Sequence, residues 1–383
     1  MQKTICGNWG ERVSIRQTLL FNDSYLHYDF IQELNNLWCI FSDDSVEDNI
    51  KDIQLHEASR SIVESMEVGL EKKLTFNYAD NPKQIKTNKD DNFILCCVSG
   101  GKDSLAVVLY YIKKGYKVQL YTLAGINKGY PEEYRAAIKL ADKLGLPIYV
   151  DEIKVCGKKY YTEHPLKNQI IAGCAVAYCL NNNLPVNIAF GDYKEETEDK
   201  SNFRVNWSDN FNLWEKFNTF INVFVENASV QIPFNKESEA LEVLFDNFDL
   251  VPLYQSCLMM VRDRESLRQK NQKKYNIKLL ENRCGSCYKC CLEYIYFCDR
   301  GKFEYNRDFY KHCLEILKKK YVDYTGPKQV GNIKTLEDVH KAYFNDLPSL
   351  FFNDKTLDTK QRSDSVDLYT KEEDCKVIKQ ELF

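Results

Sequence analysis

The sequence lacks an apolar run long enough to span a membrane, and it does not open on a basic segment followed by an apolar stretch. Net charge is also small, because 52 Lys and Arg oppose 56 Asp and Glu to give −4. The five histidines form no cluster, and no internal repeat is visible. We therefore expect a cytoplasmic protein that does not associate with membranes. With no global positive field, a nucleic-acid partner is not expected.

Cysteine, in contrast, is abundant. The 383 residues include 15 cysteines, and no secretory signal accompanies them. Reduced thiols, with metal binding favoured over disulfides, are the expectation for such a chain. The length is sufficient for a large core and for more than one domain.

Composition divides the chain into three regions. Residues 1–90 contain a β-like run at 38–41, an acidic segment at 43–52 and a helical pattern at 62–70, and we expect an N-terminal accessory region. A polar linker at 81–92 precedes residues 93–300, which have the pattern of an α/β domain. Residues 301–383 are predicted to be helical, with a polar tail.

The most informative motif follows the apolar run 93–98 and precedes a helical pattern at 105–110. Its residues are Ser99, Gly100, Gly101, Lys102, Asp103 and Ser104. Glycines allow the backbone to approach a ligand, and the N–H groups and dipole of a helix N-terminus favour phosphate. The motif is not a GxxxxGK[ST] P-loop. We predict an anion-binding loop between a buried strand and a helix.

Further strands and helices alternate after this loop. Strands are predicted at 116–123, 146–150 and 186–190, with helices beginning at Pro131 and Pro165. This alternation predicts an α/β fold with a parallel sheet and helices on both faces. Ligands bind at the carboxyl ends of such strands, so the loop 99–104 and residues 123–125 should share one crevice. Gly191 and Asp192 end the last strand. Asp192 is interpreted equally well as a ligand or metal contact and as an Asx turn.

A second motif, Cys284-x-x-Cys287-x-x-Cys290, brings three thiols into one short loop. A tetrahedral zinc site needs a fourth ligand. Cys291 is too close to Cys290 to chelate with it, so Cys257 is preferred and Cys298 is the alternative. Zinc in a structural role is favoured over an iron–sulfur cluster, which remains the second interpretation.

The loop resembles the pyrophosphate loop, SGGxDS, of N-type ATP pyrophosphatases, which have the adenine nucleotide alpha hydrolase-like fold. Together with the cysteines, it resembles the 7-cyano-7-deazaguanine synthase (QueC) family over residues 93–300. The resemblance implies ATP, Mg²⁺ and Zn²⁺ as cofactors and a C–N bond-forming ligase that converts ATP to AMP and pyrophosphate. It implies adenylation of 7-carboxy-7-deazaguanine, adenine binding at Leu123 and Ala124, substrate binding at Gly191 and Asp192, and zinc at Cys257, Cys284, Cys287 and Cys290.

Three segments depart from the family pattern. The substrate segment aligns with residues 207–211, which keep Asp209 but have Phe211 in place of Arg. Asp209 is interpreted either as a contact to a guanine-like ring edge or as a helix N-cap. A phosphate-facing Lys is replaced by Glu239, with Lys236 nearby. The insertion between Cys257 and Cys284 holds eight Lys and Arg against three acids; a solvated helix face is favoured there over a nucleic-acid patch.

Catalytic roles are expected for Lys102 and Asp103. Lys102 either contacts phosphates or is a solvent-facing helix residue. Asp103 either binds Mg²⁺ or is a carboxylate at the helix N-terminus that the helix dipole favours. Ser99 and Ser104 either donate to phosphate or act as caps. The departures suggest a specialised relative in bacterial anti-phage defence, in which the acceptor is a protein amine rather than ammonia. The alternatives are a tRNA-modifying ATP pyrophosphatase and a nucleotide-binding scaffold with reduced catalysis.

Overall fold

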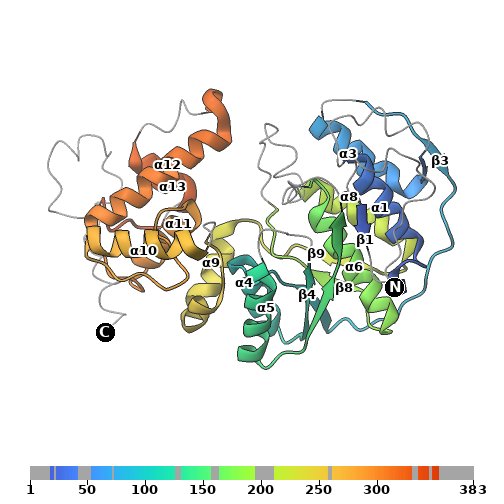
Figure 1. Cartoon of the computed structure of the whole chain (residues 1–383), viewed down its shortest axis with the longest axis horizontal. Helices are drawn as coiled ribbons and strands as arrows, with labels where there is room; N and C mark the ends of the chain where they lie inside the picture. Colours follow the sequence, from blue (N-terminus) through green and yellow to red (C-terminus); the bar gives the residue numbers. More distant parts are fainter. Residues whose placement is uncertain are drawn as a thin grey trace. The chain divides into compact units, whose positions relative to one another are not determined.

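The computed structural model describes residues 18–20, 23–41, 53–70, 73–125, 131–156, 164–194, 211–257, 261–329, 335–344 and 347–352. These residues fall into two compact units, one within Met1–Ala240 and one within Leu241–Phe383 (Figure 1). The functional regions predicted from composition, 1–90, 93–300 and 301–383, stay a prediction. None of the described helices is both long enough and apolar enough to cross a membrane.

The first unit is built on a five-stranded sheet in which every pair is parallel. Its strands, in the order β6-β5-β4-β8-β9, are β6 (Ile148–Glu152), β5 (Lys117–Ala124), β4 (Phe93–Cys97), β8 (Asn187–Ala189) and β9 (Ser229–Gln231). All residues of the central strand β4 are buried, as its unbroken apolar run predicts. The α/β fold with a parallel sheet is confirmed.

Helices cover both faces of this sheet. The chain moves outward through α4 (Lys102–Lys113) and α5 (Pro131–Leu144), then returns across the sheet through α6 (Lys167–Asn181) and α8 (Phe211–Phe224). Because parallel crossovers are right-handed, this reversal puts α4 and α5 on one face and α6 and α8 on the other (Figure 1). The reversal occurs between β4 and β8, which creates a switch point at their carboxyl ends.

An N-terminal layer packs outside α6 and α8. It consists of α1 (Asp29–Phe41), which contacts both helices, and α3 (Arg60–Leu70), which contacts α8. The β-like interpretation of 38–41 is wrong, because these residues lie in α1. Their apolar run continues the helical spacing of Phe30, Leu34 and Leu37, all of which are buried. The helical pattern at 62–70 is confirmed.

Short elements complete this unit. β1 (Thr18–Leu20) pairs antiparallel with β7 (Lys154–Cys156), and β2 (Gln54–His56) pairs parallel with β3 (Asn77–Ala79). Single 3₁₀ turns occur at Asp23–Tyr25 and Glu57–Ser59. Within the predicted linker, Ile85 bonds through its backbone to Phe224 and Glu226, so this segment is tied to the end of α8.

The outer edge of β9 is closed by one side chain. In the described part of the chain β9 pairs only with β8, and the Val230 backbone faces away from that partner. Val230 N–H donates to Asn218 Oδ1 at 2.8 Å, and Asn218 Nδ2 donates to Val230 O at 2.8 Å. The Asn218 carboxamide thus satisfies the groups that an added strand would otherwise use.

The second unit is helical. It contains most of α9 (Glu237–Asp246), a 3₁₀ segment at Phe248–Leu253, α10 (Val261–Tyr275), α11 (Tyr288–Asp299), α12 (Arg307–Gln329) and α13 (Leu336–Phe344). A buried carboxylate, Asp299, accepts hydrogen bonds from Tyr310 Oη at 2.6 Å, His340 Nε2 at 2.9 Å and Leu350 N–H at 2.9 Å. Asp299 therefore ties three helices and the segment after them together.

Replacing Asn218 with Ala should lower the free energy of unfolding by about 1–3 kcal/mol, because the buried Val230 backbone loses both partners. Urea denaturation measures this loss. Thr219→Ala is the matched control, since Thr219 is exposed and its hydroxyl bonds Glu215 O within its own helix. An unchanged midpoint for Asn218→Ala would show that water replaces the carboxamide.

Candidate functional site

The loop 99–104 joins β4 to α4 at the switch point of the sheet. Gly100 has φ +79°, in the left-handed region that favours glycine, and this allows the sharp exit from the strand. The N-cap of α4 is Gly101, which has no side chain to bond the first N–H groups of the helix. The helix therefore directs these N–H groups and its positive end toward an incoming anion.

Two serines hold the ends of this loop together. Ser99 N–H donates to Ser104 Oγ at 3.1 Å, and the two hydroxyls lie 3.2 Å apart. Ser104 thus closes the loop, and both hydroxyl groups lie at the N-terminal turn of α4. Their predicted donation to a phosphate remains a prediction.

The end of β8 lies directly against the loop. A Cβ atom on Gly191 would fall 2.6 Å from Asp103 C and 2.8 Å from Ser104 N, closer than side chains can approach backbone. Gly191 and the loop therefore share one crevice, as the strand order requires. Asp192 accepts hydrogen bonds from Trp214 Nε1 at 2.8 Å and Asn168 Nδ2 at 3.2 Å. These donors anchor its carboxylate to α8 and α6.

Lys102 is the most buried charged group of the crevice. Its side chain is 1% exposed, so the solvent-facing interpretation is wrong. The ammonium pairs with the Asp103 carboxylate, lies 2.5 Å from Glu237 Oε1, and donates to Tyr193 Oη at 3.2 Å. Burial acts to lower the pKa of Lys102, but the charges of Asp103 and Glu237 outweigh it and hold that pKa well above its ordinary value. Lys102 is therefore fully charged at neutral pH.

Tyr193 and Glu237 are site residues that the sequence reasoning missed. The Tyr193 hydroxyl also donates to Asp103, and burial raises the pKa of Tyr193 well above its ordinary value. Tyr193 directly follows Gly191 and Asp192 at the end of a strand, and this position could have indicated that it belongs to the site. Glu237 begins α9 and reaches Lys102 only through the fold, so no local pattern indicated it.

The remaining predicted contacts lie farther along the sheet edge or outside the described residues. Leu123 and Ala124 end β5, next to β4, and pair in register with Asp151 and Glu152 of β6. They share the carboxyl edge of the sheet with the loop, and their adenine contact stays a prediction. Asp209 lies outside the described residues.

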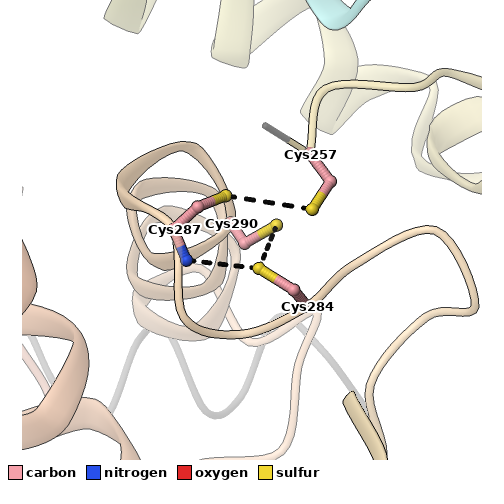
Figure 2. A group of neighbouring side chains, drawn as sticks. All are labelled: Cys257, Cys284, Cys287 and Cys290. Atoms are coloured by element: carbon pink, nitrogen blue, oxygen red, sulfur yellow. Dashed lines mark hydrogen bonds between the residues drawn. The ribbon is translucent and has the colours of Figure 1, made fainter. Parts of the chain in front are cut away.

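The second candidate site is a cluster of four buried thiols, Cys257, Cys284, Cys287 and Cys290 (Figure 2). Their sulfur atoms all lie within 4.8 Å of one another. The Cys284–Cys290 sulfurs are 3.8 Å apart, and the Cys257–Cys287 sulfurs are 4.0 Å apart. The four thiols can hold a metal ion, and Cys257 completes the set, as predicted. In the described part of the chain, Cys298 does not join this group.

Backbone and side-chain groups support the cysteine loop. The N–H groups of Ser286 and Cys287 each donate to Cys284 Sγ at 3.2 Å, which holds this sulfur in position within the loop. Contact with Cys257 acts to raise the pKa of Cys287, but bonds with Cys284 and Cys290 lower it to about 7. One thiolate is therefore accessible near neutral pH, the form in which cysteine binds metal.

Two buried contacts fix the ends of this loop. Arg283 Nε donates to Glu293 Oε2 at 2.6 Å, which joins the residues on either side of the three cysteines. Asn271 of α10 donates to Cys284 O at 2.8 Å. Arg283 and Arg264 are buried, so part of the basic insertion between Cys257 and Cys284 lies inside the protein rather than on a solvated helix face. Its exposed part is formed by Lys270, Lys273, Lys274 and Lys278.

No family model matches this chain, and no curated protein matches it. Among solved structures, it is similar to the NMN synthetase from Francisella tularensis, with 16% identity over 41% of this chain and 62% of that chain (TM-score 0.27). It is also similar to the U34-tRNA thiolase NcsA from Methanococcus maripaludis, which has a [4Fe-4S] cluster, with 18% identity, 49% and 68% coverage, and a TM-score of 0.31.

A third similar structure is the NH₃-dependent NAD synthetase from Campylobacter jejuni, with 13% identity over 62% of this chain and 95% of that chain (TM-score 0.28). The chain thus spans less than two thirds of the NMN synthetase. All three are distant likenesses, and at these TM-scores they carry no argument about the site or its reaction.

Gly191→Ala should lower the free energy of unfolding by about 1–3 kcal/mol, because the added methyl group meets loop backbone that cannot rotate away. Urea denaturation measures this change. Gly115→Ala is the control, since a Cβ at Gly115 meets nothing within 4 Å. Its change in unfolding free energy therefore reports only the cost of a positive φ for Ala. A Gly191→Ala midpoint equal to that of the unmodified chain would contradict the close approach.

The purified chain should retain about one metal ion, as four closely spaced thiols predict. Cys257→Ser should lose most of it, whereas Cys298→Ser should retain it, because Cys298 is not part of the cluster. Elemental analysis after dialysis against a weak chelator measures the difference. Retention by Cys257→Ser together with loss from Cys298→Ser would identify Cys298 as the fourth ligand instead.

Proposed function

We propose that this chain is a QueC-like ATP-dependent ligase that adenylates a carboxylate and joins it to an amine. The observation that carries the proposal is the position of the loop 99–104 at the switch point of a parallel sheet. There, uncapped N–H groups of α4, the buried Lys102 ammonium and two hydroxyl groups converge on one crevice. This donor set suits the β- and γ-phosphates of ATP.

The reaction needs few covalent contributions from the protein. A substrate carboxylate oxygen attacks the α-phosphorus, and the bond to pyrophosphate breaks. The amine nitrogen then attacks the acyl carbon, AMP leaves with the bonding electrons, and the nitrogen releases a proton. The loop N–H groups and Lys102 hold the departing pyrophosphate, so positioning and charge stabilisation provide the rate enhancement. Mg²⁺ bound with ATP supplies further positive charge, and Asp103 would hold it.

Substrate contacts are assigned by the same resemblance. Leu123 and Ala124 would bind adenine, and Gly191, Asp192 and Asp209 would face a 7-carboxy-7-deazaguanine-type acid. Departures at Phe211 and Glu239 favour a changed acceptor, namely a protein amine, and a role in anti-phage defence. A partner protein that carries this amine is part of the proposal.

We assign zinc to the cysteine cluster. A tetrahedral ion with metal–sulfur bonds near 2.3 Å separates its sulfurs by about 3.8 Å. The sulfur–sulfur separations of 3.8 and 4.0 Å suit one ion of this size. A cluster of several irons would hold the sulfurs farther apart. Four thiolates leave no open coordination position, so the ion has a structural role.

The decisive measurement is the nucleotide product formed from Mg-ATP with and without 7-carboxy-7-deazaguanine. AMP that forms only with the acid supports the ligase. Lys102→Gln should lower AMP formation at least about 100-fold, because a buried charge on the leaving phosphates is lost. Lys113→Gln is the control on the same helix, since Lys113 is exposed. ADP as the product, or no turnover with any acid and amine, would contradict the proposal.

A further inference from the structure

We infer that Glu237 makes pyrophosphate binding at the loop 99–104 depend on a divalent cation, so that the crevice selects metal-complexed over free phosphate ligands. The inference rests on the proposed function, because it concerns the same loop. It assigns a specificity-determining role to a residue that belongs to neither sequence motif.

The geometry puts Glu237 in direct competition with phosphate. Its Oε1 lies 2.5 Å from Lys102 Nζ, the only buried lysine among the described residues. The ammonium also contacts Asp103 and Tyr193 Oη. A phosphate oxygen that is to bond Lys102 must therefore take the position of a carboxylate oxygen that already bonds it.

The two partners differ in their freedom to move. Lys102 is 1% exposed, whereas Glu237 is 30% exposed and lies on the first turn of another helix, α9. Glu237 can turn its carboxylate toward water, whereas the enclosed ammonium cannot leave. The lost ion pair to Lys102 is the cost that a phosphate ligand has to meet. Exchange of the carboxylate for a phosphate thus proceeds by displacement of Glu237, and Lys102 keeps its position.

The charges explain why a cation is needed. Lys102 contributes one positive charge, and Asp103 and Glu237 contribute two negative charges, so these three side chains are net negative. A free pyrophosphate meets like charge at close range, in surroundings where burial strengthens repulsion. A ligand that arrives with its own divalent cation does not meet this repulsion, because the cation neutralises part of its charge. Removal of the Glu237 charge should therefore favour the free anion most.

The experiment measures binding of inorganic pyrophosphate by calorimetry, in excess Mg²⁺ and in EDTA with no added metal. Glu237→Gln should tighten binding in EDTA at least about fivefold, and the affinity ratio between Mg²⁺ and EDTA should fall. Glu242→Gln is the matched control. Glu242 lies on the same helix α9 and loses the same charge, but it pairs with Arg300 and accepts from Tyr296 Oη rather than bonding Lys102. Its affinities should be close to those of the unmodified chain.

Each other outcome overturns the inference. Equal EDTA affinities for Glu237→Gln and the unmodified chain would show that Glu237 does not compete with phosphate. Equal gains in pyrophosphate affinity for both variants would show that the effect comes from the loss of one negative charge and not from the contact with Lys102. Weaker Mg²⁺-dependent binding with unchanged EDTA binding would make Glu237 a metal contact. In these three cases the unmodified chain still binds pyrophosphate with Mg²⁺, so the proposed function stands. If no variant binds pyrophosphate or ATP in any condition, the proposed function fails as well.

Discussion

The close approach of Gly191 to the backbone of Asp103 and Ser104 is the constraint on which the crevice depends. It brings the end of β8 within van der Waals distance of the first turn of α4. The residues that follow Gly191 then take their positions from it. Asp192 is directed to donors on α6 and α8, and Tyr193 is directed to Asp103 and Lys102. One residue without a side chain thus connects the anion-binding turn to both helical layers.

Local patterns were sufficient for the parts of the fold that repeat along the chain. The apolar run 93–98, the glycines after it and the alternation to residue 190 predicted four strands of the parallel sheet, the helices between them and the loop, because each of these elements depends on residues close in sequence. The helix α8 and the fifth strand, β9, lie beyond residue 190 and were not predicted. The spacing of Cys284, Cys287 and Cys290 predicted a three-thiol loop, and Cys257, preferred over Cys298 as its fourth member, lies in the cluster. The run at 38–41 was misread as a strand because four consecutive apolar residues have no period by themselves.

The partners of Lys102 could not be predicted, for a different physical reason. A buried ammonium requires counter-charge, but the sequence does not say which carboxylate supplies it. Glu237 is supplied by a helix that begins after the last strand of the sheet, and it meets Lys102 only when the chain is folded. The cysteine cluster is easier to predict, since three of its members share one loop. Even there, Arg283 lies in a stretch that reads as simply basic, and its buried partner Glu293 lies outside that stretch, in α11.

The hydrogen bonds of Asp299 limit when the helical unit can finish folding during synthesis. Its three partners are contributed by Tyr310, His340 and Leu350, so the last of them leaves the ribosome well after the sheet has been made. Until then, a carboxylate destined for the interior keeps an incomplete set of donors and favours water. The helical unit therefore closes only after residue 350 has been made, whereas the sheet unit needs none of these three partners. A chain shortened before residue 350 should therefore keep the crevice and lose the packing of its last helices.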